Sequence, residues 1–266
     1  MKLIKKIIAP NPSFFTGDGT NTYLIGRKDI TLIDPGPNIS KHIDEIIIEG
    51  ENNIKRILVT HSHKDHSSAA RPLADKLNIP LMGMKAKNNY LNNDVTFYPN
   101  KELKDGDLIH TNEYSIQVIH TPGHASNHLS FLIKNEDCLI VGDHLMNGST
   151  VVISPPDGDM RDYIISLKKL MNYKIKILAP GHGDYINNPR DNINLIIQHR
   201  LNREFKILEK LKDKRSKNIK KLVEDVYDDV SPSLHSIAIM SLEAHLIKLN
   251  DDKKILFENE MCKLIE

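Results

Sequence analysis

Residues 61–66, His-Ser-His-Lys-Asp-His, gather four side chains of the types that bind metal ions, directly after the apolar run 57–59. The apolar run is typical of a buried strand, so these side chains would lie on the loop that leaves it. Two imidazoles one residue apart in an extended segment point the same way and can bind one ion. Asp65 and His66 lie where the chain turns toward a helix, which aims them at a second point. One zinc ion takes about four ligands, and these four side chains are aimed at two points, so the loop offers two half-sites. The pattern therefore predicts a fold in which other segments supply the remaining ligands.

A solvated loop that happens to be rich in histidine is the alternative interpretation. The chain has 13 His among 266 residues, so three within six positions around an Asp would rarely arise by chance. Three further candidates lie downstream, His124 in the sequence HTPGH, Asp143 in IVGD and His182 in APGHG. Each follows an apolar, strand-like run, and a neighbouring Gly or Pro lets the backbone turn sharply to present the ligand.

In their order along the chain, these segments resemble the ligand-bearing segments of the metallo-β-lactamase superfamily. The resemblance runs from residues 19–24 (GTNTYL) through 33–36 (IDPG) to 181–183 (GHG). It implies an α+β fold, a four-layer αββα sandwich with a dinuclear metal centre at one edge. The implied cofactors are two Zn²⁺ ions, although His and carboxylate ligands also suit Fe or Mn. The implied ligands are His61, His63 and His124 for the first ion and Asp65, His66 and His182 for the second, with Asp143 bridging both.

This arrangement predicts a metal-dependent hydrolase. Two divalent cations about 3.5 to 4 Å apart lower the pKa of a shared water enough to give hydroxide near neutral pH. Asp65 would be the catalytic residue, binding its ion through one oxygen and orienting the bridging water through the other. The hydroxide could attack an acyl carbon or a phosphorus. The sequence contains no Gly-x-Ser-x-Gly nucleophile motif and no phosphate-binding loop that would indicate a different chemistry.

Other residues are weaker candidates. His128 is either a second-layer or substrate-contacting group, or a histidine at a strand end bonded to backbone. Asn21 and Arg200 are the two other predicted substrate contacts. His144 would turn away from the metals if its neighbour Asp143 faces them. Cys138 lies in an apolar run and is expected to be a small buried residue.

Length and composition predict one large domain and one small one, in the cytoplasm. With 39% hydrophobic residues the chain can bury a sizeable core, and no apolar run approaches the ~20 residues of a membrane span. The start, residues 1–10, could mimic a signal peptide, but Lys5 and Lys6 interrupt its apolar portion, so an N-terminal strand is expected. Two Cys give no disulfide framework, which fits a reducing compartment.

Strands and helices are predicted to alternate up to about residue 100 and to give way to a second set of short strands. The expected strands of the first half are 31–33 and 57–59, and its helices 40–48 and 67–77. The expected strands of the second half are 107–109, 115–119, 129–133, 139–141 and 175–178, with a helix at 163–171. We expect one catalytic domain over residues 1–198, with each ligand segment ending at the same edge.

Residues 199–266 are predicted to form a basic linker helix and a small module. Residues 200–221 contain ten Lys or Arg and three Asp or Glu, which gives +7, whereas the whole chain is +1. Such a basic stretch is either a binding surface for a phosphate backbone or a solvated linker helix. Helical spacing after residue 218, followed by a hairpin at 253–257 and 261–265, indicates a winged-helix arrangement. That module could bind nucleic acid, or serve only packing or dimerisation.

Within the superfamily, the sequences at 11–14 (NPSF), 198–200 (QHR) and 244–249 (AHLIKL) resemble the lactamase-β-2 type branch, whose animal members are single-strand-selective endoribonucleases. The resemblance implies single-stranded RNA as substrate, bound in an open channel lined by residues 200–221. The sequence differs from this branch at Ser67-Ser68-Ala69, where such enzymes often carry glycines. The difference affects the expected shape of the pocket floor. A thioesterase or glyoxalase-II-like hydrolase, with a basic cluster near the pocket, is the second possibility. The third is a non-catalytic nucleic-acid-binding protein, against which the seven intact ligands argue.

Overall fold

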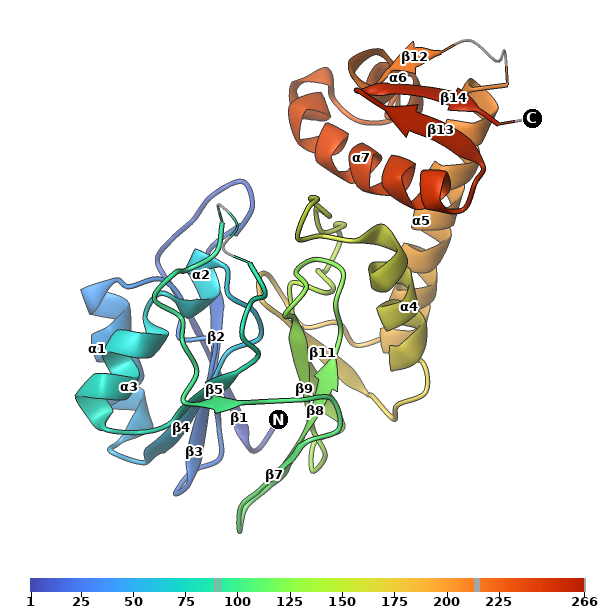
Figure 1. Ribbon diagram of the computed structural model, residues 1–266. Helices are drawn as coiled ribbons and strands as arrows, with labels where there is room; N and C mark the ends of the chain where they lie inside the picture. Colours follow the sequence, from blue (N-terminus) through green and yellow to red (C-terminus); the bar gives the residue numbers. More distant parts are fainter. Residues whose placement is uncertain (89, 91, 213–215, 266) are drawn as a thin grey trace.

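Two β-sheets lie face to face in the computed structural model, which describes residues 1–88, 90, 92–212 and 216–265 (Figure 1). The first sheet contains, in spatial order, β1 Ile4–Ile8, β2 Asn21–Ile25, β3 Ile30–Ile33, β4 Ile54–Leu58, β5 Leu81–Gly83 and β6 Lys101–Glu102. The second contains, in spatial order, β11 Ile177–Pro180, β10 Cys138–Gly142, β9 Leu129–Ile133, β8 Ser115–His120 and β7 Leu108–His110. Strands β3 to β6 pair in parallel, as do β10 and β11, and the other neighbours pair antiparallel.

Helices cover the outer faces of both sheets (Figure 1). The first sheet is covered by α1 Ser40–Gly50 and α3 Ala70–Leu77, and the second by α4 Met160–Leu170 and α5 Pro189–Lys210. The short helix α2 Lys64–Ser67 precedes α3. Three apolar cores fill the spaces between the four layers, and the central one includes Tyr23 from the first sheet and Phe131 from the second. The predicted αββα sandwich is therefore confirmed.

Burial on both faces explains the apolar runs in the sequence. Every residue of β2, β3, β9 and β10 is buried, because each of these strands contacts the other sheet on one face and helices on the other. Cys138 begins β10 and is fully buried, as expected, and it is a free thiol. No helix in the described part of the chain is long and apolar enough to cross a membrane.

The C-terminal module has an apolar core of its own. It contains β12 Lys217–Asn218, α6 Ile219–Val226, the 3-10 turn Pro232–Leu234, α7 His235–Asp251, β13 Ile255–Glu258 and β14 Met261–Leu264. The predicted hairpin is β13–β14, and β12 adds a third strand. Helix α5 packs on the sandwich through Ile193 and Ile197 and enters the core of the module at Ile207. The predicted domain boundary after residue 198 therefore lies inside one continuous helix.

The structure differs from the predicted elements in three additional strands and in one predicted helix that is divided in two. The predicted N-terminal strand is present as β1, but β2, β5 and β6 were not predicted as strands. Strand β5 has three residues and β6 two, which is too short for a hydrophobic period to be visible. The helix predicted over 67–77 is two helices, α2 and α3, and Asp65 and His66 lie in α2.

Candidate metal centre

All seven predicted ligands lie together, and they come from loops at one end of the two sheets. His61 and His63 follow β4, His124 lies between β8 and β9, and Asp143 and His182 follow β10 and β11. Asp65 and His66 are presented by α2. Their ligand atoms form two clusters, one of His61, His63 and His124 and one of Asp65, His66, Asp143 and His182.

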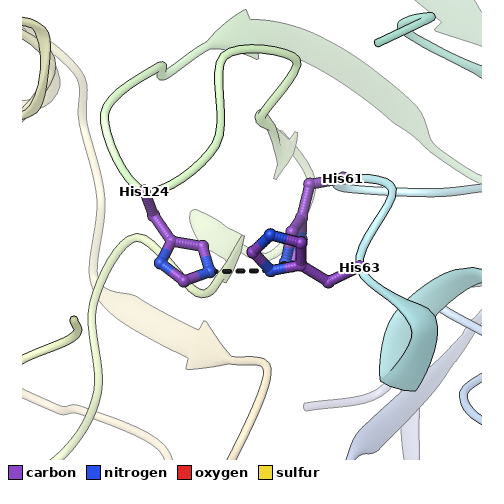
Figure 2. Close-up of side chains that lie close together, drawn as sticks. All are labelled: His61, His63 and His124. Atoms are coloured by element: carbon purple, nitrogen blue, oxygen red, sulfur yellow. Dashed lines mark hydrogen bonds between the residues drawn. The ribbon is translucent and has the colours of Figure 1, made fainter. Parts of the chain in front are cut away.

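The first cluster is a triangle of imidazole nitrogens (Figure 2). His63 Nδ1 lies 3.0 Å from His61 Nε2 and 3.0 Å from His124 Nε2. Burial, followed by the nearby His124, lowers the pKa of His63 to about 3, so its ring is neutral near pH 7. Neutral ring nitrogens that converge in this way are suited to a divalent cation such as Zn²⁺.

The second cluster has the dimensions of a tetrahedral site. His66 Nε2 lies 3.3 Å from His182 Nε2, 3.3 Å from Asp143 Oδ1 and 3.6 Å from Asp65 Oδ2. His182 Nε2 lies 3.3 Å from Asp65 Oδ2 and 3.4 Å from Asp143 Oδ1. A tetrahedron with metal–ligand bonds of about 2.0 to 2.2 Å has edges of about 3.3 to 3.6 Å. The donor types and their spacing therefore fit one metal ion.

Asp143 connects the two clusters. Its Oδ1 belongs to the second cluster, while its Oδ2 lies 3.7 Å from His124 Nε2 in the first. Burial alone would lower the pKa of His182, but Asp143 and Asp65 raise it to about 9. Without an ion, a proton on this ring would therefore offset the carboxylates, and a bound cation would replace that proton.

Asp34, a residue with no role predicted from the sequence, supports the second cluster. Its Oδ2 accepts a hydrogen bond from His66 Nδ1 at 2.9 Å, which turns His66 Nε2 toward the other ligands. Asp34 is held by the backbone N–H and the hydroxyl of Thr60, both at 2.7 Å. Thr60 Oγ1 also lies 3.0 Å from Nδ1 of His61. The available sequence signal was an Asp-Pro-Gly turn directly after an apolar run.

Backbone carbonyls orient two other ligands in the same way. His182 Nδ1 donates to Gly19 O at 3.2 Å, and His124 Nδ1 donates to Val152 O at 2.9 Å. In both rings Nε2 is left as the atom that could bind a metal ion. Close packing also requires a glycine before His182, because a Cβ on Gly181 would lie 2.6 Å from His66 Cε1 and would contact Asp143 Oδ1.

Ser67, the departure from glycine noted in the sequence, tightens the metal-binding loop. Its single hydroxyl hydrogen is shared between two acceptors, His63 O at 3.0 Å and Asp94 Oδ2 at 3.2 Å from Oγ. Asp94 N in turn donates to Ser62 O at 2.7 Å. The residue therefore joins the loop after β5 to the loop that carries the ligands.

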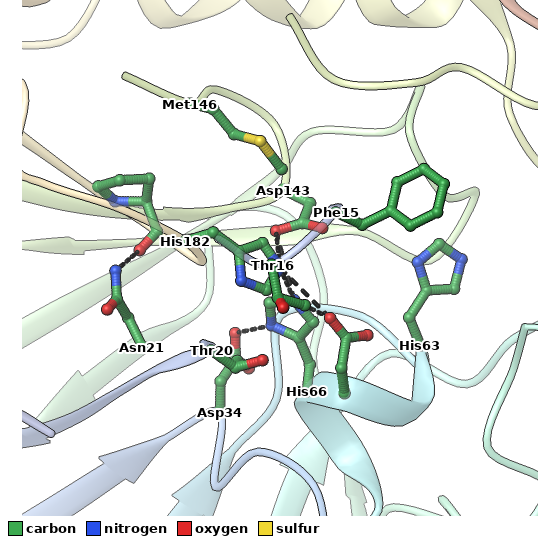
Figure 3. A network of polar contacts seen from close by, with 12 residues as sticks. Phe15, Thr16, Thr20, Asn21, Asp34, His63, His66, Asp143, Met146 and His182 are labelled. Carbon is green, nitrogen blue, oxygen red and sulfur yellow. Dashed lines mark hydrogen bonds and ion pairs between the residues drawn. The ribbon is translucent and has the colours of Figure 1, made fainter. Parts of the chain in front are cut away.

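The three predicted substrate contacts are buried behind the ligands. Asn21 donates to Pro180 O at 3.0 Å and to Gly183 O at 2.8 Å, which holds the loop of His182 (Figure 3). The exposed fractions of the three predicted contacts are 1% for Asn21, 0% for His128 and 2% for Arg200. These positions argue against direct substrate contact. His144 is also fully buried and belongs to neither cluster of ligand atoms.

His128 and Arg200 each have an identifiable structural contact. His128 Nδ1 lies 2.9 Å from Thr121 Oγ1, and its ring centroid lies 5.1 Å from that of His61. Arg200 donates to Val151 O at 2.6 Å and lies over the ring of Tyr163. Both side chains therefore support the site from within the fold.

Two of the cations expected to line an open basic channel over residues 200–221 do not face solvent. Arg200 and Arg203 are buried, and Arg203 forms a two-pronged pair with Asp229 at 2.8 and 3.0 Å. Residues 199–266 contain 14 Lys or Arg and 13 Asp or Glu, a difference of +1, so acids of the module offset the basic helix. The other described cations of this stretch that lie within 3.9 Å of a carboxylate are Lys206, Lys212, Lys217, Lys220 and Lys221.

The loop between β1 and β2 brings apolar side chains to the site. Phe14 and Phe15 are 67% and 54% exposed, and their rings meet edge to face at 5.4 Å. In Figure 3, Phe15 and Met146 lie on the other side of the ligands from Asp34. The loop is ordered by Thr16, whose hydroxyl donates to Asn11 O at 2.6 Å. The open side of the ligand cluster is therefore partly apolar.

Comparison with known proteins gives two family matches. The model of the metallo-β-lactamase superfamily matches residues 15–182. The model of the β-lactamase-associated winged helix domain matches residues 219–260, which confirms the predicted winged helix.

Relatives match nearly the whole chain. A β-lactamase-like protein 2 homologue of Drosophila melanogaster is 30% identical over 94% of this chain and 88% of its own length. An atrochrysone carboxyl ACP thioesterase of Aspergillus chevalieri is 27% identical over 96% of this chain and 83% of its own length. The crystal structure of a metallo-β-lactamase family protein from Thermus thermophilus aligns with a TM-score of 0.83 at 17% identity, covering 100% of this chain and 99% of that one.

Proposed function

The chain belongs to the metallo-β-lactamase superfamily of hydrolases, and from that premise we propose that it hydrolyses acyl thioesters at a two-metal centre. The choice of substrate rests on the ion pairs between the basic helix and the carboxylates of the C-terminal module. Arg203 and Lys206 are engaged by Asp229 and Asp228, so their charge is not free to follow a phosphate backbone. An acyl thioester presents a carbonyl carbon for attack, and its binding does not require a row of free cations.

The seven ligands would hold two ions, which we propose are Zn²⁺. When bound, the ions would supply hydroxide near neutral pH and would offset negative charge that develops on the substrate. Asp65 faces His66 and His182 through Oδ2, and its side chain is 32% exposed. We assign its Oδ1 to accept a hydrogen bond from the attacking water and to orient it. In the reaction a C–O bond forms, the C–S bond breaks, and the thiolate takes up the proton released from water.

Two further observations support a thioester. The relative from Aspergillus chevalieri is named as a thioesterase and aligns with 96% of this chain. Phe14 and Phe15 are exposed on an ordered loop beside the ligands, and they can contact the apolar part of an acyl group.

Single-stranded RNA is the second candidate substrate. Adjacent exposed phenylalanines beside a hydrolytic site could also stack unpaired bases, and the chain carries a winged helix. If RNA binds along the basic stretch, reversing Lys212, Lys214 and Arg215 to Glu should weaken binding and flatten its salt dependence. Lys214 and Arg215 lie outside the described residues.

One experiment separates the two substrates. Zinc-loaded protein is incubated with acyl-CoA thioesters of increasing chain length, with S-lactoylglutathione, and with labelled single-stranded RNA. We expect release of free thiol, intact RNA, and no turnover by Asp65→Ala. RNA cleavage without thiol release would overturn the thioester proposal. Activity retained in Asp65→Ala would overturn the assigned role of Asp65.

A further inference from the structure

Residues 151–153 connect a metal ligand to the C-terminal part of the chain. Val152 O accepts the hydrogen bond from His124 Nδ1 at 2.9 Å. On one side of it, Val151 O accepts from Arg200 Nη2 at 2.6 Å. On the other side, Ile153 N donates to Ser241 Oγ at 3.1 Å. Three successive residues thus contact the ligand, α5 and α7.

The groups that hold this segment are themselves firmly placed. Arg200 is 2% exposed and its guanidinium lies 5.3 Å from the ring of Tyr163 on α4. Ser241 is 7% exposed. Arg161 on α4 also pairs with Asp252, just after α7, at 2.8 Å. The module is therefore docked on the sandwich where α7 also contacts the segment 151–153.

The two metal clusters differ in what supports them. In the second cluster, His66 is oriented by Asp34 and His182 by the carbonyl of Gly19, both within the sandwich. In the first cluster, His124 is oriented by a carbonyl whose two neighbours are fixed by α5 and α7. A hydrogen bond to the far nitrogen of a ligand histidine sets its tautomer and its angle, and its loss weakens metal binding about 10- to 100-fold.

We propose that helix α5 and the C-terminal module together control the first metal site by holding residues 151–153, with Arg200 on α5 and Ser241 on α7 as positioning residues for His124. Displacement of the module, with which α5 is continuous, would move Val152 O and release the ring of His124. Occupancy of the first site would then fall while the second site kept its ion. This inference rests on the two-metal centre proposed above but not on its substrate.

The test measures metal binding and not turnover. Ser241→Ala and Arg200→Met are loaded with Zn²⁺, dialysed against increasing chelator, and analysed for metal content. Ser236→Ala is the matched control, because Ser236 is an exposed serine on the same helix. The same variants are titrated with Co²⁺, whose visible absorption reports the geometry of its histidine ligands. Thermal unfolding of the metal-free proteins separates site effects from global ones.

We expect Ser241→Ala and Arg200→Met to lose the first ion at about tenfold lower chelator concentration than wild type, and to keep the second. Arg200→Lys, which retains a cationic donor, should recover part of the affinity, and Ser236→Ala should match wild type. Unchanged affinity for both ions would overturn the inference. Equal weakening of both ions with a lower melting temperature would also overturn it, because the effect would then be global. A wild-type protein that binds a single ion would overturn both this inference and the two-metal proposal, whereas failure of the thioester assay would leave this inference intact.

Discussion

Asp34 Oδ2 lies 2.9 Å from Nδ1 of His66, and both side chains are completely buried. Asp34 has a φ of 50°, a left-handed conformation that few residues other than glycine adopt without strain. The backbone N–H and hydroxyl of Thr60 fix both carboxylate oxygens. A buried carboxylate is thus held at a fixed angle behind a candidate metal ligand, as expected of a group that orients the ring.

Replacing Asp34 with Asn should weaken the second ion selectively. The amide keeps the shape of the carboxylate but removes the charge that favours a hydrogen on His66 Nδ1, so a reduction of about 10- to 100-fold in affinity is expected. Metal content after graded chelation checks this, with Asp44→Asn on the exposed side of α1 as the control. If Asp34→Asn kept both ions as tightly as wild type, Asp34 would not orient His66.

Gly181→Ala should disrupt the second cluster by steric contact alone. The added Cβ would lie 2.6 Å from His66 Cε1 and against Asp143 Oδ1, neither of which can move without leaving the cluster. We expect loss of the second ion and at least a hundredfold loss of activity, about 2.7 kcal/mol in the activation free energy. Gly148→Ala is the control for an added methyl group without steric contact, because its φ of +74° strains the backbone but nothing lies within 4 Å of the added Cβ. An active Gly181→Ala enzyme with two ions would contradict the observed packing.

Changing both Phe14 and Phe15 to Ser should lower kcat/KM for long-chain acyl thioesters and leave metal content unchanged. Burial of one such ring against a ligand contributes roughly 1.5 to 3 kcal/mol, so a loss of about tenfold or more is expected. The loss should shrink as the acyl chain shortens, because less apolar surface is then buried. Ile48→Ser, at a position on α1 that is 72% exposed, is the matched control. Equal losses for all chain lengths would place the acyl group elsewhere.

The sequence predicted which side chains lie together at the candidate metal centre, because the position of each depends on local information. His61, Asp143 and His182 follow apolar runs, and the ends of neighbouring strands meet at one edge of a sheet. Contacts between distant segments could not be predicted in this way. The stretch 200–221 is basic in the sequence, but Asp229 folds back onto Arg203 across 26 residues. Likewise, Arg200 faces Val151 only because α5 packs on the sandwich.

His245 should make the C-terminal part of the chain sensitive to acid. It is completely buried on α7, and neither ring nitrogen has a hydrogen-bond partner among the described residues. Burial lowers its pKa from 6.5 to about 4, although Glu204, 3.5 Å away, favours the charged ring. The unfolded chain therefore binds a proton at higher pH than the folded one. The stability that the neutral ring provides is present above pH 6.5 and is lost as the pH falls toward 4.

His245→Gln should remove this part of the pH dependence, because the amide does not titrate. Urea unfolding of wild type and variant at pH 7.5 and pH 5, followed by circular dichroism, checks it. The free energy of unfolding of wild type should drop by about 2 kcal/mol more than that of the variant between these pH values, since each pH unit below the unfolded pKa of 6.5 corresponds to about 1.4 kcal/mol. His110→Gln, an exposed histidine on β7, is the control and should behave as wild type does. A parallel loss in wild type and His245→Gln would show that acid acts through other groups.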